Sequence, residues 1–344
     1  MLLRLLWGGN LKLNHYREPR CDGNANAAMR PSNASTRQQT AMTSPLAPKM
    51  SVLISTRNRR RQLESVLQQL DTAAVQANTA TEIVVVNNGS SDSTEGFLDT
   101  WQKQGEGRKF LTVPQPGKSR ALNHALQVAG APLLAFTDDD VIVPPDWIAA
   151  VQTFFREHPE YAAAMGAVRL PPSETSPEVA RLVDCYPGII PLFDAGPQCC
   201  DVGDMYGCNM AIRREALAVV GGFNEQLGPG ANGYCDDTEL SYRIRRGGMR
   251  IGYMPQAVMF HSVDRSRLTL AAFRDYQLRC AYGRYVMSPQ QSWMHEAMRL
   301  GNAALSRIVW WLRRNEPKRL HALGRMIRHR ELLRLRWRAR GVAP

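Results

Sequence analysis

Short apolar runs alternate with segments of helical periodicity through the first half of the sequence. Four strands are predicted, at 49–56, 82–88, 109–115 and 132–139. The run EIVVVNN at 82–88 is apolar almost throughout, as expected for a parallel strand that is covered on both faces. The segments between the strands carry apolar residues at helical spacing, as in Leu63, Val66, Leu67 and Leu70. This βαβαβαβ order predicts a doubly wound, mostly parallel α/β sheet.

The second half of the sequence is less regular. Helices are predicted at 146–158, 213–222 and 236–248, and strands at 162–170 and 205–212. Residues 171–200 hold six prolines, which is typical of loops. The segment 249–262 is predicted to be a pair of strands carrying His261 near its end. From about residue 268 the chain is predicted to be helical and increasingly basic.

The net charge of +12 is unevenly distributed along the chain. Residues 1–49 carry +5 and residues 299–344 carry +11, whereas the chain between them carries −4. A basic tail on a mildly acidic body fits an anionic membrane surface or an acidic partner at least as well as nucleic acid. The seven cysteines form no CxxC pair and no zinc spacing, which predicts reduced thiols in a cytoplasmic protein.

Three consecutive carboxylates, Asp138, Asp139 and Asp140, follow the apolar run at 133–136. In a doubly wound sheet, ligands bind beyond the carboxyl ends of the strands, so these side chains lie at the expected ligand edge. Asp138 and Asp140 form a D-x-D pair that offers oxygen ligands to Mn²⁺ or Mg²⁺, with substrate phosphates completing the coordination. A solvated turn whose aspartates cap the next helix gives the same pattern, and the residues alone leave both interpretations open.

Several segments together resemble the family 2 glycosyltransferases, which have the nucleotide-sugar-binding GT-A fold. SVLISTRNR resembles the first strand and nucleotide loop of the family, EIVVVNNGSSDST its second strand and base-binding turn, and GKSRALNHAL its phosphate-side helix. AFTDDDVIVPPDW resembles its D-x-D strand, and GCNMAIRREALAVVGGFNEQLG and CDDTELSYRIRRGG resemble its acceptor-side motifs. The resemblance covers roughly residues 50–265 and rests on the order and spacing of the segments.

The resemblance implies a GT-A catalytic domain at 50–267, with a nucleotide-binding half at about 50–145 and an acceptor half at about 146–267. Residues 1–49, which are rich in Asn, Ala, Ser, Thr, Gln and Pro, are predicted to be a disordered extension. Residues 268–344 are predicted to form a basic helical region.

On the donor side, the resemblance implies contacts to a nucleoside-diphosphate sugar by seven residues. They are Thr56, Arg57, Asn58, Asn88, Arg120, Asn123 and Asp138. Thr56 and Asn88 would line the nucleoside pocket, and the family often has Asp where this chain has Asn88. Arg120 and Asn123 would lie near the phosphates or the sugar, although their spacing equally fits an exposed helix face.

For a divalent metal, Mn²⁺ or Mg²⁺, the resemblance implies Asp140 as the main ligand and Asp138 as a ligand of the metal or the ribose. His261 would be a third ligand of the metal or the diphosphate, and a capped histidine at a strand end is the alternative. Asp139 is predicted to point to the other face of the strand and to matter least.

The segment CDDTEL carries the predicted general base. Asp236 and Glu239 have capping-box spacing at a helix start, which would let Asp237 project from the first turn toward the cleft. The resemblance implies that Asp237 is the base and that Asp236, where the family usually has Glu, contacts the acceptor. The helix dipole alone also favours an acidic first turn, so the spacing does not by itself assign a base.

The reaction implied by the resemblance is an inverting transfer of a sugar from a metal-bound nucleoside-diphosphate sugar to a hydroxyl acceptor in polysaccharide or glycoconjugate assembly. The acceptor would be a saccharide or a lipid-linked saccharide, on which Trp147 and Tyr234 would stack unless they pack in the protein. The alternatives are a nucleotidyltransferase, a non-catalytic nucleotide-sugar-binding protein and a nucleic-acid-binding module. The first two would not need Asp237, and nucleic acid is not an expected partner.

The basic C-terminal region bears on location. Trp310, Trp311, Leu312 and Trp337 lie among arginines, which fits either a helix on an anionic membrane surface or a helical subdomain packed on the body. The predicted location is cytoplasmic, and peripheral on the inner face of the cytoplasmic membrane if these helices bind it.

Overall fold

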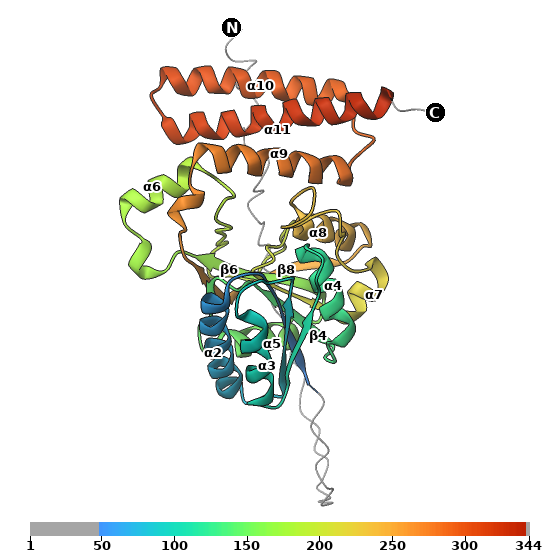
Figure 1. Ribbon diagram of the computed structural model, residues 1–344. Helices are drawn as coiled ribbons and strands as arrows, with labels where there is room; N and C mark the ends of the chain where they lie inside the picture. The colour runs from blue at the N-terminus through green and yellow to red at the C-terminus, as the bar shows by residue number, and fades with distance from the viewer. Residues whose placement is uncertain (1–47, 342–344) are drawn as a thin grey trace, which may run out of the picture.

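The computed structural model describes residues 48–341, and the side chains as far as residue 339 (Figure 1). All but the last two residues of the predicted disordered extension, 1–49, lie outside the described residues. The α/β body occupies one end of the molecule, and three long helices are stacked at the other end (Figure 1).

The secondary structure follows the predicted alternation through the first half of the chain. The strands are β1 Met50–Thr56, β2 Thr81–Asn87, β3 Arg108–Thr112, β4 Leu133–Thr137, β5 Val141–Ile142, β6 Tyr161–Arg169, β7 Asn209–Arg213 and β8 Arg250–His261. The helices of the body are α2 Arg60–Ala77, α3 Thr94–Lys103, α4 Lys118–Val128, α5 Trp147–Glu157, α6 Pro177–Cys185, α7 Arg214–Val220 and α8 Asp236–Arg246, with 3₁₀ turns η1 Pro172–Glu174 and η2 Arg265–Arg267. The C-terminal helices are α9 Leu270–Met287, α10 Trp293–Leu312 and α11 Glu316–Gly341.

The eight strands form one sheet in the order β3-β2-β1-β4-β7-β6-β8-β5. β1 pairs in parallel with β2 and β4, and β2 pairs in parallel with β3. β7 is antiparallel to both of its neighbours, β4 and β6. The prediction of a doubly wound, mostly parallel α/β sheet is confirmed, with β7 and β5 as the antiparallel members.

Helices cover both faces of the sheet because successive strand residues point to opposite faces. In β1, Val52 and Ile54 join the core beneath α2, α3 and α5, whereas Leu53 joins the core beneath α4, α7 and α8. All three side chains are completely buried, and each contributes about 1.5–3 kcal/mol relative to an exposed position. This double covering is the reason for the nearly continuous apolar strands in the sequence.

The register of the sheet fixes where the candidate site lies. Thr56 at the end of β1 lies opposite Asn87 at the end of β2, and Ile54 lies opposite Thr137 at the end of β4. These three strands therefore finish at the same edge of the sheet, and the polar segments that follow them leave it side by side.

The predicted pair of strands at 249–262 is wrong, since β8 is a single strand of 12 residues. Gly166 of β6 lies opposite Met254, but Val168 lies opposite Met259, so a bulge takes up the intervening residues of β8. The bulge accommodates Pro255, which has no N–H to donate to a regular ladder. His261 at the end of β8 pairs with Val141 of β5, which brings it next to the aspartates.

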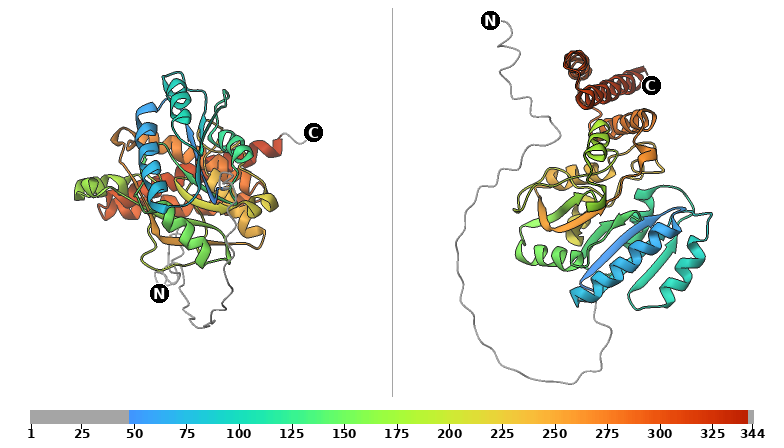
Figure 2. Two further views of the ribbon diagram at one scale, coloured as in Figure 1. Left: turned by 90° about the horizontal axis from the view of Figure 1, so that it is seen from below. Right: turned by 90° about the vertical axis from the view of Figure 1, so that its left-hand side faces the viewer.

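The C-terminal helices pack on one another and on the body. α11 contacts α10, α9 and α6, and α10 and α11 lie outermost in the side view (Figure 2). α9 lies nearer the body, where Phe273 is completely buried against Ile189 and Ile190. The sequence left open whether the C-terminal helices pack on the body or lie on a membrane surface. In the structure, α9 and α11 pack on the body.

None of the helices between residues 48 and 341 combines the length and the apolar character that crossing a membrane would require.

Candidate active site

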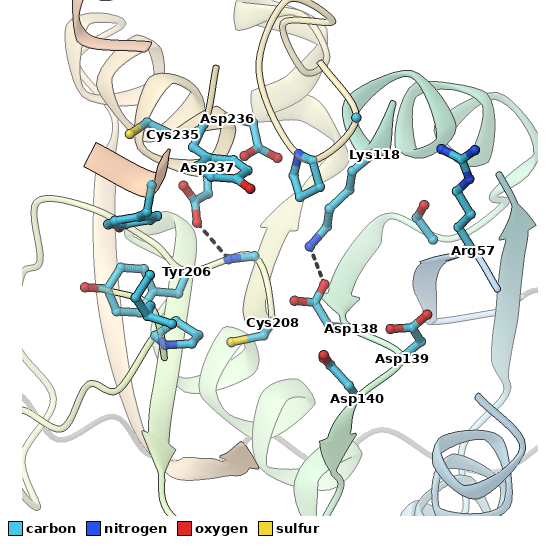
Figure 3. A pocket seen from close by; sticks show the side chains of 18 of the residues that line it. Arg57, Lys118, Asp138, Asp139, Asp140, Tyr206, Cys208, Cys235, Asp236 and Asp237 are labelled. Carbon is cyan, nitrogen blue, oxygen red and sulfur yellow. Dashed lines mark hydrogen bonds and ion pairs between the residues drawn. The ribbon is translucent and has the colours of Figure 1, made fainter. Parts of the chain in front are cut away.

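A cavity of about 600 Å³ opens at the edge of the sheet where β1, β2 and β4 end. Its far wall comes from the loop at 188–191 and from α9, which contributes Asp275 and Tyr276. The predicted D-x-D turn and the predicted acidic pair of α8 face each other across this cavity (Figure 3).

Asp139 is the most deeply buried of the three consecutive aspartates, at 4% exposure. It accepts hydrogen bonds from Thr56 Oγ1 at 2.7 Å and from Arg59 Nη1 at 2.8 Å. The same guanidinium nitrogen lies 2.7 Å from Asp140 Oδ2. Asp139 lines the cavity with its neighbours, so the prediction that it points to the other face is wrong. The reason is that β4 ends at Thr137, and strand alternation does not continue into the turn.

Lys118, a residue not predicted from the sequence, provides a cation beside the aspartate turn. Its ammonium group forms an ion pair with Asp138 (Figure 3). Burial opposes the charge of Lys118, but the carboxylates of Asp138 and Asp236 outweigh burial and raise its pKa above the usual range. Burial would likewise raise the pKa of Asp138, but Lys118 more than offsets it and lowers that pKa. Both members of the pair are therefore charged at neutral pH.

Two backbone carbonyls of the loop after α7 hold the start of α4, from which Lys118 projects. Lys118 N–H donates to Pro229 O at 2.9 Å, and Ser119 Oγ donates to Leu227 O at 2.7 Å. Gly228 has φ +95°, and a Cβ there would lie 2.9 Å from Ser119 Oγ. The loop after α7 is thereby closed against the first turn of α4, and Lys118 is fixed between the two halves of the cavity.

Asn88 is a positioning residue for this same turn. Its Nδ2 donates to Val113 O at 3.1 Å and to Gln115 O at 2.8 Å, and its Oδ1 accepts from Gly117 N–H at 2.8 Å. The side chain is 4% exposed, although it reaches the cavity wall. Its amide thus holds the loop that leads to Lys118, and its place in the cavity wall leaves the predicted role in a nucleoside pocket a prediction.

The other predicted donor residues divide into two groups. Thr56 and Arg57 line the cavity, as expected of donor contacts. Asn58 instead adopts φ +54° and joins the β1–α2 loop to the β2–α3 loop, since its N–H donates to Ser90 Oγ at 3.0 Å and its Oδ1 accepts from Ser91 N–H at 2.7 Å. Asn58 therefore lies outside the lining and braces the loop beside it.

Arg120 and Asn123 also lie outside the cavity lining. Arg120 Nε pairs with Glu225 Oε2 at 3.0 Å. Asn123 Nδ2 donates to Phe223 O at 2.9 Å, and its Oδ1 accepts from Phe223 N–H at 2.8 Å. Both side chains turn toward the loop after α7, whereas Lys118 faces the cavity, so a donor contact by Arg120 or Asn123 stays a prediction.

The acidic pair occupies the first turn of α8. Cys235 is the N-cap residue and adopts a left-handed conformation with φ +74°, and Asp236 is the first helical residue. The predicted capping box is absent, since Glu239 instead pairs with Arg243 at 2.8 Å. Asp237 nevertheless faces the cavity, as the capping box was expected to arrange, and Asp236 faces it as well (Figure 3).

Asp237 has the ionisation of a base that works near neutral pH. Burial and the neighbouring Asp236 carboxyl raise its pKa to about 7, despite hydrogen bonds from Gly207 N–H at 3.1 Å and Thr238 N–H at 2.7 Å. Burial also raises the pKa of Asp236, against the opposing charge of Lys118. A carboxyl group with a pKa near the working pH can accept a proton in a reaction and release it afterwards.

Gly207 separates the acidic pair from the cation. A Cβ built on Gly207 would lie 3.6 Å from Lys118 Nζ and 4.0 Å from Asp237 Oδ2. The glycine therefore leaves free space between the two charged groups, where reacting atoms would have access to both.

His261 and Asp140 are placed so that both could coordinate one divalent cation. His261 Nδ1 bonds to Ser262 O at 3.0 Å, which places the proton on that nitrogen and leaves the lone pair on Nε2. Nε2 lies 3.7 Å from Asp140 Oδ1, the oxygen that faces away from the bond with Arg59. Among residues 48–341, no three His, Cys, Asp or Glu side chains form a complete metal site, so a metal here would rely on substrate oxygens as well.

Of the two predicted acceptor-side aromatic residues, only Tyr234 lines the cavity. Its ring lies 5.8 Å from that of Tyr276 on α9, and Arg279 lies over it at 5.4 Å. Trp147 is completely buried in the core, where its Nε1 donates to Asn209 Oδ1 at 2.8 Å. The expectation that Trp147 stacks on an acceptor sugar is wrong, because the helix that it begins packs against the sheet.

The chain resembles known proteins over much of its length. The model of the family described as "Glycosyl transferase family 2" matches residues 51–221. The succinoglycan biosynthesis protein ExoM of Rhizobium meliloti is 26% identical over 215 residues, which are 62% of this chain and 67% of that protein. The glucosyl-dolichyl phosphate glucuronosyltransferase of Haloferax volcanii is 23% identical, with 62% of this chain and 69% of that protein covered.

A third relative, the beta-monoglucosyldiacylglycerol synthase of Synechocystis, is 25% identical, with 60% of this chain and 42% of that protein covered. Among solved structures, the mannosyltransferase PcManGT of Pyrobaculum calidifontis, in complex with GDP-Man and Mn²⁺, superposes with a TM-score of 0.50. It is 20% identical, and the match covers 87% of this chain and 77% of that one, which shows a shared fold. The predicted GT-A fold is confirmed by this likeness, and residues 51–221 belong to the family 2 glycosyltransferases.

Proposed function

We propose that this glycosyltransferase moves a sugar from a nucleoside-diphosphate sugar to an acceptor hydroxyl and inverts the anomeric configuration. The observation that carries the proposal is the placement of Asp237, with a pKa of about 7, across one cavity from the Lys118–Asp138 ion pair. A base on one side and a cation on the other suit a single displacement, in which a proton is removed from the acceptor while a diphosphate departs.

Each step has a residue of this chain to perform it. Asp237 takes the proton from the acceptor hydroxyl as the oxygen attacks the anomeric carbon, a role typically worth about 10²–10⁴ in rate. Lys118 holds its positive charge toward the oxygens of the departing nucleoside diphosphate, and stabilises the negative charge that develops there. Because one displacement links attack to departure, the configuration at the anomeric carbon is inverted.

Asp140 and His261 would hold a divalent cation, Mn²⁺ or Mg²⁺, with Asp138 beside them. When bound, such an ion supplies Lewis-acid stabilisation of the diphosphate. Arg59 contributes by fixing the turn, since it bonds to both Asp139 and Asp140 and so orients Asp140 Oδ1 toward His261.

The acceptor wall supports a saccharide or a lipid-linked saccharide as the acceptor. Tyr234 and Tyr276 present adjacent rings, which suit stacking on a sugar, and Asp275 and Arg267 supply polar groups beside them. The names of the three relatives refer to succinoglycan biosynthesis, glucosyl-dolichyl phosphate and monoglucosyldiacylglycerol, which supports a role in polysaccharide or glycoconjugate assembly.

A donor screen with Mn²⁺ that follows the release of nucleoside diphosphate tests this proposal, together with NMR of the anomeric configuration of the product. Asp237→Asn and Asp140→Ala are each expected to lower kcat/KM by at least about tenfold, a modest demand on catalytic groups. A product of retained configuration, or two fully active variants, would contradict the mechanism.

We also propose that the outer face of α10 binds an anionic membrane surface. Met294, Met298, Leu305, Ile308 and Leu312 recur at helical spacing and are each between 57% and 67% exposed. Residues 293–341 carry a net charge of +10, which complements anionic lipid headgroups.

Co-sedimentation with phosphatidylcholine vesicles, with and without phosphatidylglycerol, tests the membrane proposal. We expect at least about tenfold stronger binding to the anionic vesicles, and loss of that binding in Leu305→Glu/Ile308→Glu. Val75→Glu, at an 81% exposed position on α2, is the matched control and should bind as the unaltered protein does. Equal binding by the α10 variant, or a dimer in solution that buries this face, would overturn the proposal.

A further inference from the structure

Two cysteines meet directly beside the acidic pair. Cys235 precedes Asp236 and lines the cavity, and Cys280 lies on α9 at 3% exposure. Their side chains are hydrogen-bonded to each other, and both are free thiols. The two cysteines are 45 positions apart in the sequence, so their contact is formed by the fold and could not be predicted from their spacing.

The backbones on either side of the two thiols are held close together. Tyr234 N–H donates to Arg279 O at 3.2 Å, which ties the loop before α8 to α9 one residue away from each cysteine. A Cβ on Gly283 would lie 2.1 Å from Tyr234 O and 3.3 Å from Cys235 Cβ, so the glycine permits this approach. The pair therefore belongs to a fixed junction between the first turn of α8 and α9.

The surroundings of the two thiols are unequal. The hydrogen bond from Cys235 lowers the pKa of Cys280 against the effect of burial, and Arg328 of α11 adds to the lowering. The same hydrogen bond and burial raise the pKa of Cys235 well above its usual value. Arg328 is 8% exposed, and nothing in residues 48–341 accepts a hydrogen bond from its Nε. A pair with one thiolate-favouring member and one protonated member suits stepwise oxidation.

We propose that Cys235 and Cys280 are a redox site at which a hydroperoxide forms a disulfide that switches sugar transfer off. In the first step, the Cys280 thiolate attacks hydrogen peroxide, and with one proton yields a sulfenic acid and water. In the second step, the Cys235 thiol displaces a second water and closes the disulfide. Two thiols lose two electrons in total, and one peroxide is reduced to two waters.

The disulfide would act on Asp237 through the first turn of α8. A disulfide holds its sulfur atoms about 2.05 Å apart, much closer than hydrogen-bonded thiols, so Cys235 must move toward α9. Asp237 follows two residues later, and its carboxyl is aligned by Gly207 N–H and Thr238 N–H. A displacement of about 1 Å at a reacting group can cost on the order of 10² in rate, so a small shift of this turn is sufficient.

The test treats the reduced, purified full-length protein with graded hydrogen peroxide and maps disulfides by mass spectrometry without reduction. We expect a peptide that links Cys235 to Cys280, and a loss of sugar transfer of at least about tenfold that dithiothreitol restores. Cys280→Ser should form no such link and keep its activity under the same treatment. Cys200→Ser, at another buried cysteine distant from the pair, is the matched control and should respond as the unaltered protein does.

The disulfide map does not depend on sugar transfer, whereas the switch rests on the proposed function, so the two can fail separately. Absence of the Cys235–Cys280 peptide at peroxide levels that oxidise other thiols overturns the site. A link that forms without loss of transfer overturns the switch, as does equal inactivation of Cys280→Ser. If Cys280→Ser does not fold, the map and the reversal by dithiothreitol in the unaltered protein decide the matter.

Discussion

Two clusters of aspartates face the cavity, Asp138 to Asp140 on the donor side and Asp236 with Asp237 on the acceptor side, and they differ in the charged groups that surround them. The donor-side aspartates are paired with cations of the chain: Lys118 lowers the pKa of Asp138, and Arg59 bridges the other two, although burial still raises the pKa of Asp139. For the acceptor-side pair, the more distant charge of Lys118 and hydrogen bonds from backbone N–H groups only partly offset burial and the repulsion between the two carboxyls, and the pKa of Asp237 rises to about 7. Neighbours therefore decide whether a buried carboxyl remains an anion or becomes a base.

The largest expected effect comes from removing the cation that maintains this difference. Lys118→Met should lower kcat/KM by about 10²–10³, because a preorganised charge at the leaving group is lost. It should also lower the free energy of unfolding in urea by roughly 1.5–3 kcal/mol, since Asp138 is left partly buried without its partner.

The double variant Lys118→Met/Asp138→Asn is the control for the stability effect. It should recover part of the free energy of unfolding without recovering activity, because the unpaired carboxylate is gone but the cation is still missing. Full activity in Lys118→Met would show that the cation has no part in catalysis.

A smaller loss is expected from filling the space between the clusters. Gly207→Ala places a methyl group at ordinary contact distance from Lys118 Nζ and Asp237 Oδ2, so the fold should be retained. The substrate loses that volume, and kcat/KM should fall by about tenfold or more. Thermal unfolding measured beside steady-state kinetics separates the two effects, and a variant that is as active as the unaltered protein would exclude this space as the reaction site.

A change in pH dependence, rather than a large loss, is expected from Asp236→Asn. The base must be deprotonated, so kcat/KM in the unaltered protein should rise with pH through about 7. Removing the neighbouring carboxyl removes a cause that raises the pKa of Asp237, and the rising limb should move to lower pH. The pH profile of the variant tests this, with the exposed Asp201→Asn as the control, and an unmoved limb would contradict the pairing.

The smallest effect is expected from Arg120→Ala. Arg120 lies two residues from Lys118 on α4, but it pairs with Glu225 in a half-exposed ion pair outside the cavity. Kinetic parameters should change by less than about threefold and the free energy of unfolding by less than about 1 kcal/mol. A loss comparable to that of Lys118→Met would restore Arg120 as a donor contact.

The fold could be predicted largely because its sheet is covered on both faces. The inner strands β1, β2 and β4 must be largely apolar on both sides, and each intervening helix must have one apolar face, so the sequence alternates visibly. Residues 249–262 misled the prediction because Pro255 is a typical turn residue, whereas the structure takes it up in a bulge.

The site could be predicted only in part, because a sequence does not indicate the direction of side chains beyond the end of an element. The position of Asp237 at a helix start facing the cavity was expected from the family resemblance, although the capping box that suggested it is absent. In the segment that holds Lys118, the family resemblance pointed to Arg120 and Asn123 instead. Only the packing of α4 decides which face of this helix meets the cavity. Trp147 shows the converse, since an aromatic residue beside the aspartate turn is a core residue.

The close approach of α9 to the loop before α8 has a consequence for engineering. The family match ends at residue 221, before Asp237, and Asp275 and Tyr276 of α9 complete the cavity beyond it. A chimera that joined this family region to the C-terminal helices of a relative would exchange a wall of the active site along with them. Any such graft has to carry Gly283 and its contact with Tyr234, because a side chain at that position would push the two apart.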